Sequence, residues 1–257
     1  MKRLAWSRSE DIAAVARQKH THACDLDALG RIKSLGWLSA SELSELAEAL
    51  EVRDFHRHEM ICDESGLASE AHILLGGVAC ITCANSRCQR VTVSLLAPGP
   101  IPEFPALPSS QYRFQCDAYG ACRVGAISWE RFNEINSGVA QRAMRTFHQN
   151  NLKHWYRLLL RGSSFLSLDL HERLGIALLD LCADFGTEDS RGVLLRVSLS
   201  HKDLANLVGA SRPRVTEHLA RLEQERMVIR QGRQLVVRVG QLSERRRKGE
   251  SAGFSSL

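Results

Sequence analysis

Residues Ser200 to Val239, SHKDLANLVGASRPRVTEHLARLEQERMVIRQGRQLVVRV, decide the fold of this chain because they predict a winged helix-turn-helix. The first helix is expected over residues 201–208, and Gly209 then supplies the backbone freedom that a tight turn needs. Ser211 is placed to cap the second helix. Pro213 falls in the first turn of that helix, where a missing N–H is tolerated.

The second helix is expected to have one buried face and one exposed face. Apolar residues at spacings of four and three define the buried stripe, which consists of Val215, Leu219 and Leu222. The opposite face carries the charged residues Arg212, Arg214, Glu217 and Arg221. Two short strands over residues 227–230 and 234–239 follow, and Gly232-Arg233 joins them as the tip of a wing.

Such an exposed helix end is suited to the major groove of DNA. Arginine donates two hydrogen bonds to guanine, while neighbouring hydroxyl and cationic groups hold phosphates. The residues expected to contact DNA are Ser200, His201, Ser211, Arg212, Arg214, Thr216, Glu217, Arg221 and Arg233. The alternative is that the arginines only solvate a surface, but the turn, cap, buried stripe and wing all agree with groove recognition.

This segment resembles the DNA-binding domain of the Crp/Fnr superfamily of bacterial transcription regulators. The resemblance rests on residues 203–223, DLANLVGASRPRVTEHLARLE, followed by a basic wing. It implies that Arg212 contacts the operator, that Ser211 lies near the phosphates, and that RNA polymerase is a partner. Pro213 stands where many members have a base-reading glutamate, and Glu217 stands where the cyclic-AMP receptor branch has an arginine. The family operator is therefore not assumed for this chain.

The basic charge of the chain is concentrated at its C-terminal end. Residues 201–257 carry 12 Lys and Arg against 6 Asp and Glu, whereas the first 200 residues carry 22 against 23. A basic patch confined to one domain indicates a polyanionic partner, here double-stranded DNA. Residues 241–257, which include Arg245-Arg246-Arg247-Lys248, are expected to form a flexible basic tail that adds sequence-independent attraction or serves only solubility.

Length and composition fit a globular protein with two domains. The chain has 257 residues, of which 44% are hydrophobic and 25% charged. No apolar run approaches the ~18–20 residues that cross a bilayer, and Glu10 and Asp11 interrupt the segment where a signal peptide would be apolar. We therefore expect a cytoplasmic protein without membrane contact, whose eight cysteines are thiols or ligands rather than structural disulfides.

The front half of the chain predicts an antiparallel β domain over residues 37–132. It follows a polar N-terminal extension, residues 1–36, that has no evident core of its own. Short apolar stretches alternate with Gly, Pro, Asn and Ser, a pattern typical of hairpins, with turns expected at residues 76–77 and 84–87. A short amphipathic helix is expected over residues 38–50.

Two segments of this domain resemble the sensor domain of the Crp/Fnr superfamily. They are residues 71–82, AHILLGGVACIT, and residues 121–135, ACRVGAISWERFNEI. With the helix-turn-helix, they imply an α+β fold: an N-terminal antiparallel β-roll of the cyclic-nucleotide-binding type, a long dimerisation helix over residues 133–165, and a winged helix-turn-helix domain over residues 166–240.

The expected phosphate site of such a β-roll is altered in this chain. Five of the six prolines lie between Pro98 and Pro108, and proline has no N–H to offer a phosphate. Arg113 and Glu103 are the nearest substitutes for the family's binding residues, and each stands about one residue out of register. We therefore predict that the β-roll has lost the cyclic-nucleotide phosphate site.

A single long helix is expected from residue 133 onward, with a coiled-coil seam for a homodimer. Spacings of four and three place Ala140, Met144, Phe147, Asn151, His154 and Leu158 on one face. The resemblance also implies dimerisation through this helix. The alternative is that Met144 and Phe147 pack on their own β domain.

The cysteines suggest a redox or metal sensor without defining one. Cys80, Cys83 and Cys88 have a spacing found in metal and iron–sulfur sites, but Cys80 and Cys83 would point to opposite faces of a strand. Cys83 and Cys88 would instead meet across a hairpin as a thiol pair. Haem, a cluster built from His20, His22 and Cys24 with Cys116 and Cys122, and inert cysteines remain alternatives, so the cofactor is unknown.

The sequence therefore predicts a dimeric, sequence-specific DNA-binding transcription regulator that is not an enzyme. One alternative is a metalloenzyme built on the Cys and His groups, but no H-E-x-x-H, G-x-S-x-G or P-loop spacing occurs. The other alternative is an architectural DNA-binding protein that senses nothing. The operator, the effector and the direction of regulation are not determined by the sequence.

Overall fold

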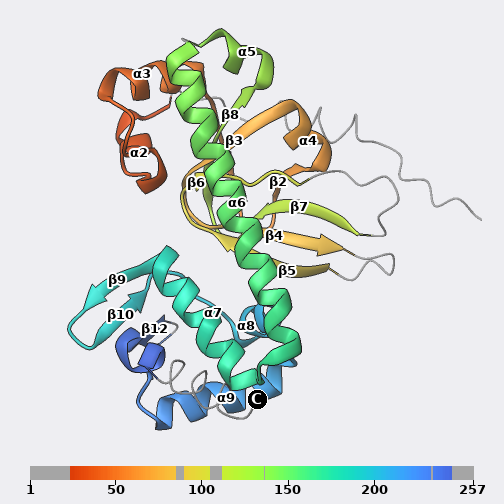
Figure 1. Cartoon of the computed structure of the whole chain (residues 1–257), viewed down its shortest axis with the longest axis vertical. Coiled ribbons are helices and arrows are strands. Elements are labelled where there is room, and N and C mark those ends of the chain that lie inside the picture. The colour runs from red at the N-terminus through yellow and green to blue at the C-terminus, as the bar shows by residue number, and fades with distance from the viewer. Residues whose placement is uncertain (1–23, 85–89, 105–111, 136, 233, 245–257) are drawn as a thin grey trace, which may run out of the picture.

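The computed structural model describes residues 24–84, 90–104, 112–135, 137–232 and 234–244. These residues form a β domain, a long helix and a C-terminal helical domain with a small sheet, so the predicted α+β class is confirmed. In Figure 1 the long helix α6, Ser137–Ser167, runs down the molecule from one domain to the other. No helix in this part of the chain has both the length and the apolar character that crossing a bilayer requires.

Two four-stranded antiparallel sheets build the β domain. The first has the order β1-β8-β3-β6, with bounds Glu51–Phe55, Cys122–Ser128, Glu70–Gly76 and Gly99–Pro100. The second has the order β2-β7-β4-β5, with bounds Met60–Asp63, Arg113–Ala118, Ala79–Ala84 and Arg90–Leu96. The short helix α4, Glu64–Ser69, links β2 to β3. Apolar side chains from both sheets form one core, which includes Phe55, Leu74, Ile81 and Val124.

The predicted turn at residues 76–77 is confirmed by the backbone of Gly77. Its φ of 86° lies in the left-handed region that favours glycine. A Cβ atom at this position would also collide with the carbonyl oxygen of Ala121. Glycine is therefore required here for both conformation and space. The turn expected at residues 84–87 lies mostly outside the described residues.

The prediction of an extension without a core is wrong for its last residues. Helix α2, Leu26–Gly30, and the 3₁₀ helix η1, Lys33–Leu35, bury Leu29, Ile32 and Leu35 against the β domain. Helix α3, Ala40–Ala49, follows with a capping box between Ser39 and Glu42. Leu29, Ile32 and Leu35 stand three residues apart, but the two helices of this segment are each only about one turn long. So short a segment has too few apolar repeats to predict a buried helix from the sequence.

The long helix begins later than predicted. Residues 133 and 134 belong to a separate helix α5, Trp129–Glu134, which Ser128 caps by accepting a hydrogen bond from the Arg131 N–H. Ile135 then adopts an extended conformation and is buried, so the chain changes direction before α6 starts at Ser137. Asn136, Ser137 and Gly138 follow directly in the sequence, and these residue types favour a turn, so the sequence does hold a signal for this break.

The C-terminal domain contains the predicted helix-turn-helix and a larger sheet than expected. Its helices are α7, Leu170–Phe185, α8, His201–Val208, and α9, Arg212–Gln224. The wing strands β11, Val228–Gln231, and β12, Gln234–Val237, continue into an unpredicted hairpin in the order β11-β12-β10-β9. Strands β9, Gly186–Asp189, and β10, Gly192–Leu195, form that hairpin.

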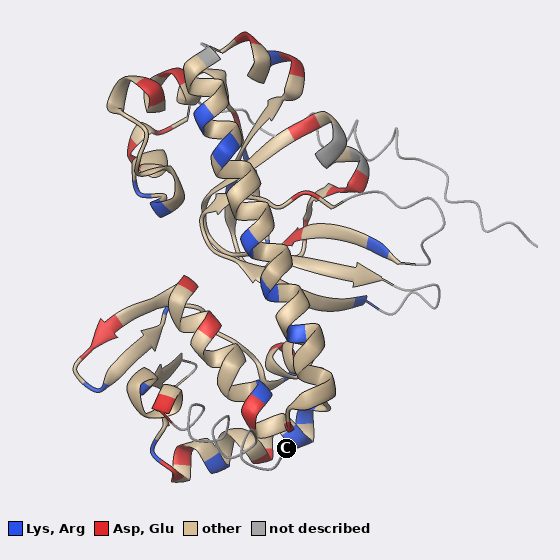
Figure 2. Cartoon of the chain, viewed as in Figure 1, with Lys and Arg blue, Asp and Glu red and all other residues tan. Residues whose placement is uncertain are grey.

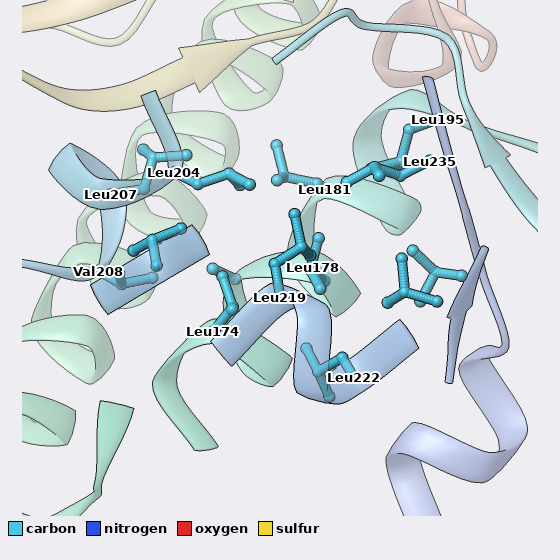
Figure 3. Close-up of a cluster of buried hydrophobic side chains, with 14 of the residues drawn as sticks. Leu174, Leu178, Leu181, Leu195, Leu204, Leu207, Val208, Leu219, Leu222 and Leu235 are labelled. Atoms are coloured by element: carbon cyan, nitrogen blue, oxygen red, sulfur yellow. The ribbon is translucent and has the colours of Figure 1, made fainter. Parts of the chain in front are cut away.

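One apolar core holds this domain together, as Figure 3 shows. Leucines of α7 meet those of α8 and α9, with Leu195 and Leu235 from the sheet. Each fully buried leucine contributes roughly 1.5–3 kcal/mol relative to an exposed one. Residues 239–244 are helical, and Leu242 packs into the same core, so the predicted tail at 241–257 begins too early. Residues 245–257 lie outside the described part of the chain.

Candidate nucleic-acid interface

The helix-turn-helix is held by local interactions at the ends of its helices. The Ser200 side chain accepts a hydrogen bond from the Asp203 N–H at 3.2 Å, and Asp203 accepts one from the Ser200 N–H at 2.8 Å. Gly209 ends α8 with φ 61° and ψ 48°. A Cβ atom at Gly209 would lie 2.7 Å from the ring of Phe165 on α6. The turn therefore depends on glycine for its conformation and for its contact with α6.

The second helix, α9, has the two faces that the sequence predicts. Val215, Leu219 and Leu222 are fully buried in the domain core. The opposite face exposes Arg212, Arg214, Thr216, Glu217 and Arg221. Ser211 occupies the N-cap position, but its side chain makes no capping hydrogen bond. Figure 2 shows basic and acidic segments along α9 at the lower end of the molecule.

Arg212 and Arg214 differ from Arg221 and Arg230, the basic residues further along this surface. In the described part of the chain, no hydrogen bond or ion pair engages either guanidinium group. Arg221, in contrast, lies 3.4 Å from Glu225, and Arg230 of the wing donates to Glu223 at 2.8 Å. The two guanidinium groups at the start of α9 are thus available for an external anion or base. Arg233 lies outside the described residues.

His201 and Thr216 act as a brace between the two helices. The Thr216 hydroxyl donates to the Arg212 carbonyl at 3.0 Å and lies 2.7 Å from His201 Nδ1. Because a hydroxyl has one proton, Nδ1–H of His201 is the donor to Thr216. Burial, with Arg230 and Arg212 nearby, lowers the pKa of His201, which favours the neutral ring. The sequence predicts both residues as DNA contacts, and the structure also gives them this positioning role.

The C-terminal domain packs against the β domain of its own chain. Cys80 and Leu95 from the outer face of the second sheet join the apolar core of the helix-turn-helix. The Tyr119 hydroxyl lies 2.8 Å from Asp203 Oδ2 and 3.0 Å from the Ser198 carbonyl oxygen. Burial and the hydrogen bond to Asp203 raise the pKa of Tyr119 well above its usual value. The β domain therefore contacts α8 directly at its capped end.

Ion pairs connect the long helix to α7 and so to the C-terminal domain. Arg157 donates to Asp184 at 2.6 Å, and Arg161 lies 3.4 Å from Asp180. The Arg161 guanidinium also donates to the Val93 carbonyl of β5 at 3.2 Å. These contacts and the Tyr119 hydrogen bond set the direction of α9 relative to the β domain.

Aromatic side chains occupy the part of the β-roll next to the proline-rich segment. Phe104 stacks on Phe114 with ring centroids 5.9 Å apart and meets Trp155 of α6 edge-on at 6.3 Å. Arg113, considered above as a phosphate ligand, pairs with Glu64 at 3.3 Å. The Glu103 N–H donates to Asn151 Oδ1 at 2.8 Å. Residues 105–111 lie outside the described part of the chain.

The predicted seam of α6 faces the protein's own β domain. Phe147 is only 2% exposed and packs edge-on against Phe132, and Met144 lies against the same core. Asn151 is engaged by Glu103, and burial lowers the pKa of His154 to about 4. Leu158 is half-buried. Met144 and Phe147 therefore pack on the β domain of their own chain, which is the alternative to a dimer seam stated above.

A different stripe of α6 is exposed. Leu152 is 71% exposed, Leu159 70% and Leu166 92%, with Tyr156 exposed between them. These four residues, the exposed α6 stripe, lie on the helix at spacings of four, three and seven. The described residues leave this large apolar surface in contact with solvent, which is rare in a monomer.

The cysteine predictions are only partly tested. Cys80 belongs to the core shared with the C-terminal domain, whereas its neighbours Ala79 and Ile81 face the interior of the β-roll. Cys83 pairs across the ladder with Phe114, which packs against that interior, so the strand alternation that places Cys80 and Cys83 on opposite faces is confirmed. Cys88 lies outside the described residues, so the pairing of Cys83 with Cys88 stays a prediction. Within those residues, no group of three or more His, Cys, Asp or Glu side chains is placed to hold a metal ion.

Sequence comparison identifies the C-terminal domain. Residues 172–245 match the family described as the Crp-like helix-turn-helix domain. A search among curated proteins finds no match.

Solved structures of similar fold, each aligned over three quarters or more of this chain, include the following three. The regulator CLP of Xanthomonas campestris, described as c-di-GMP responsive, aligns with a TM-score of 0.60 at 19% identity, covering 78% of this chain and 99% of CLP. A CooA mutant from Carboxydothermus hydrogenoformans aligns with a TM-score of 0.60 at 15% identity, covering 88% and 97%. A CRP-family transcriptional regulator from Thermus thermophilus aligns with a TM-score of 0.56 at 18% identity, covering 75% and 95%. At these identities the likeness shows a shared fold.

Proposed function

We propose that this chain is a DNA-binding transcription regulator of the Crp/Fnr superfamily and that it binds a pseudo-palindromic DNA site as a homodimer. The observation that carries the proposal is the pair of unengaged guanidinium groups, Arg212 and Arg214, on the first turn of α9. The His201–Thr216 hydrogen bond holds this turn against α8. Arg212 reads a guanine in the major groove, and Arg214 holds a phosphate beside it.

The exposed α6 stripe supports the homodimer. Leu152, Tyr156, Leu159 and Leu166, with Ser163 between the last two, repeat at four and three residues, the spacing of a two-stranded coiled coil. Pairing of two copies along this stripe removes the exposed apolar surface from water. A two-fold axis along α6 then presents two α9 helices to half-sites about one DNA turn, ~34 Å, apart.

We propose that the β domain either responds to an effector that is not a cyclic nucleotide or serves only as a dimerisation scaffold. Two observations support this. Prolines 98, 100 and 102 offer no N–H to a phosphate, and the rings of Phe104, Phe114 and Trp155 pack together beside this segment. RNA polymerase as a protein partner and a cytoplasmic location belong to the same proposal.

The proposal is tested by selecting DNA from a random duplex library with the full-length protein. We expect enriched sites with two inverted half-sites one helical turn apart, bound with two chains per duplex in sedimentation. The double variant Arg212→Ala, Arg214→Ala is the matched control and is expected to enrich nothing. A parent protein that enriches no sequence, or only single half-sites bound by one chain, would contradict the proposal.

A further inference from the structure

Two cysteines far apart in the sequence lie opposite one another in the β domain. Cys62 on β2 and Cys116 on β7 are directly paired in the antiparallel ladder. Directly opposed residues of such a ladder have Cα atoms about 4.5–5.5 Å apart. A disulfide bond spans Cα atoms about 4.4–6.8 Å apart. The backbone therefore already has the separation that a disulfide requires.

The side chains of this pair also lie together. Both thiols belong to the interior core of the β-roll, where Cys62 is 5% exposed and Cys116 is fully buried. A hydrogen bond between the two thiols, together with burial, raises the pKa of Cys116. Among the seven cysteines of the described residues, no other two are partners in a strand ladder. Cys122, in the same core, instead donates to the Val78 carbonyl at 2.9 Å.

We propose that Cys62 and Cys116 form a redox-active thiol pair that closes a cross-strand disulfide. With hydrogen peroxide, one thiol is oxidised to a sulfenic acid as the O–O bond breaks and one water leaves. The second thiol attacks that sulfur, the S–S bond forms and a second water leaves. With a low-molecular-weight disulfide, two exchange steps transfer both electrons and release two small thiols.

The position of β2 provides access to the buried pair. β2 is an edge strand of its sheet, bonded only to β7, and the ladder is irregular between Met60 and Cys62. An edge strand with a bulge is held by fewer backbone hydrogen bonds than a central strand, so it opens locally more often. Burial protects the thiols in the closed domain, because the thiolate is the reactive form. Oxidation is therefore slow and follows local opening of β2.

Disulfide mapping of the full-length protein tests this inference independently of DNA binding. The reduced protein is exposed to hydrogen peroxide or, in a second arm, to oxidised glutathione. Remaining thiols are then alkylated, and the protein is digested without reductant for mass spectrometry. We expect one dominant cross-link, between the Cys62 and Cys116 peptides, which dithiothreitol reverses. The two arms distinguish peroxide chemistry from thiol exchange.

Four variants complete the test. Cys62→Ser and Cys116→Ser should lose the cross-link, whereas Cys122→Ser, a substitution in the same core, should retain it. Because a serine in the core could unfold the domain, Cys62→Ala is mapped as well, and circular dichroism checks the fold of each variant. A dominant cross-link between other cysteines, or fully reduced Cys62 and Cys116 in the folded parent after both treatments, would overturn the proposal.

Discussion

The hydroxyl group of Tyr119 lies 2.8 Å from Oδ2 of Asp203, so the β domain bonds directly to the first helix of the helix-turn-helix in the same chain. That oxygen also accepts from the Ser200 N–H at 2.8 Å. The contact between domains and the cap of α8 thus share one carboxylate. Any movement of the β domain that breaks the Tyr119 bond alters the end of the helix that positions α9.

We predict that this hydrogen bond stabilises the docked arrangement of the two domains. Tyr119→Phe should lower the free energy of unfolding by about 0.5–1.5 kcal/mol, the usual net value of a hydrogen bond. Asp203→Asn has a larger effect, because it also weakens the Ser200 cap. Urea unfolding of both single variants and the double variant gives the coupling energy. Strictly additive effects would mean that the two side chains do not interact.

Arg212 and Arg214 should differ in what they do for DNA binding. Arg212→Ala should cost about 1–3 kcal/mol on the selected site and little on random DNA, since it removes a base contact. Arg214→Ala should weaken both, because a phosphate contact carries no sequence information. Fluorescence anisotropy at fixed salt measures the four affinities. The control variant Arg123→Ala removes the same charge from the β domain and should leave the affinity for both DNAs unchanged. Equal losses of affinity on the selected site and on random DNA for Arg212→Ala would exclude base reading.

Dimerisation should depend on the exposed α6 stripe. Leu159→Asp places a charge where two apolar surfaces meet, at a cost of several kcal/mol, and should give folded monomers in sedimentation. Val91→Asp, at an exposed apolar residue of β5, is the matched control and should remain dimeric. Phe147→Asp should instead unfold the β domain, because Phe147 lies in the core beside Phe132. A dimeric Leu159→Asp protein would place the interface elsewhere.

Cyclic AMP and cyclic GMP should not bind the β domain. The proline-rich segment lacks backbone N–H groups at residues 98, 100 and 102, and Arg113 is engaged by Glu64. Calorimetric titration of the full-length protein with each nucleotide should give no binding heat. A dissociation constant in the micromolar range for either nucleotide would refute this prediction.

Glu70 should make the stability of the β domain depend on acidic pH. Hydrogen bonds from His72 and Arg53 lower the pKa of Glu70 from 4.5 to about 2 in the folded protein. The stabilisation is therefore complete above pH 4.5 and is lost as the pH falls towards 2. Glu70→Gln should cost about 1–3 kcal/mol at pH 7, with a smaller difference at pH 3. Urea unfolding of the parent and of Glu70→Gln at pH 7 and pH 3 measures this difference in the free energy of unfolding. The exposed Glu48→Gln serves as control, and a pH-independent difference would contradict the mechanism.

The sequence by itself determined the helix-turn-helix, because its signals are local. Gly209 must accept a left-handed conformation, Pro213 is tolerated only near a helix start, and the stripe of Val215, Leu219 and Leu222 has one way to be buried. Strand alternation likewise placed Cys80 and Cys83 on opposite faces. In each case the residues that constrain one another lie within a few positions along the chain.

Only the tertiary structure decided which face of α6 meets the β domain. Helix α6 has apolar residues on two faces, and a repeat of four and three residues describes both, so the pattern does not distinguish Phe147 from Leu159. The β domain covers the face that carries Phe147. The contacts of Cys62 with Cys116 and of Tyr119 with Asp203 arise in the same way. They depend on strand order and domain docking, which bring together residues whose separation along the chain carries no periodic signal.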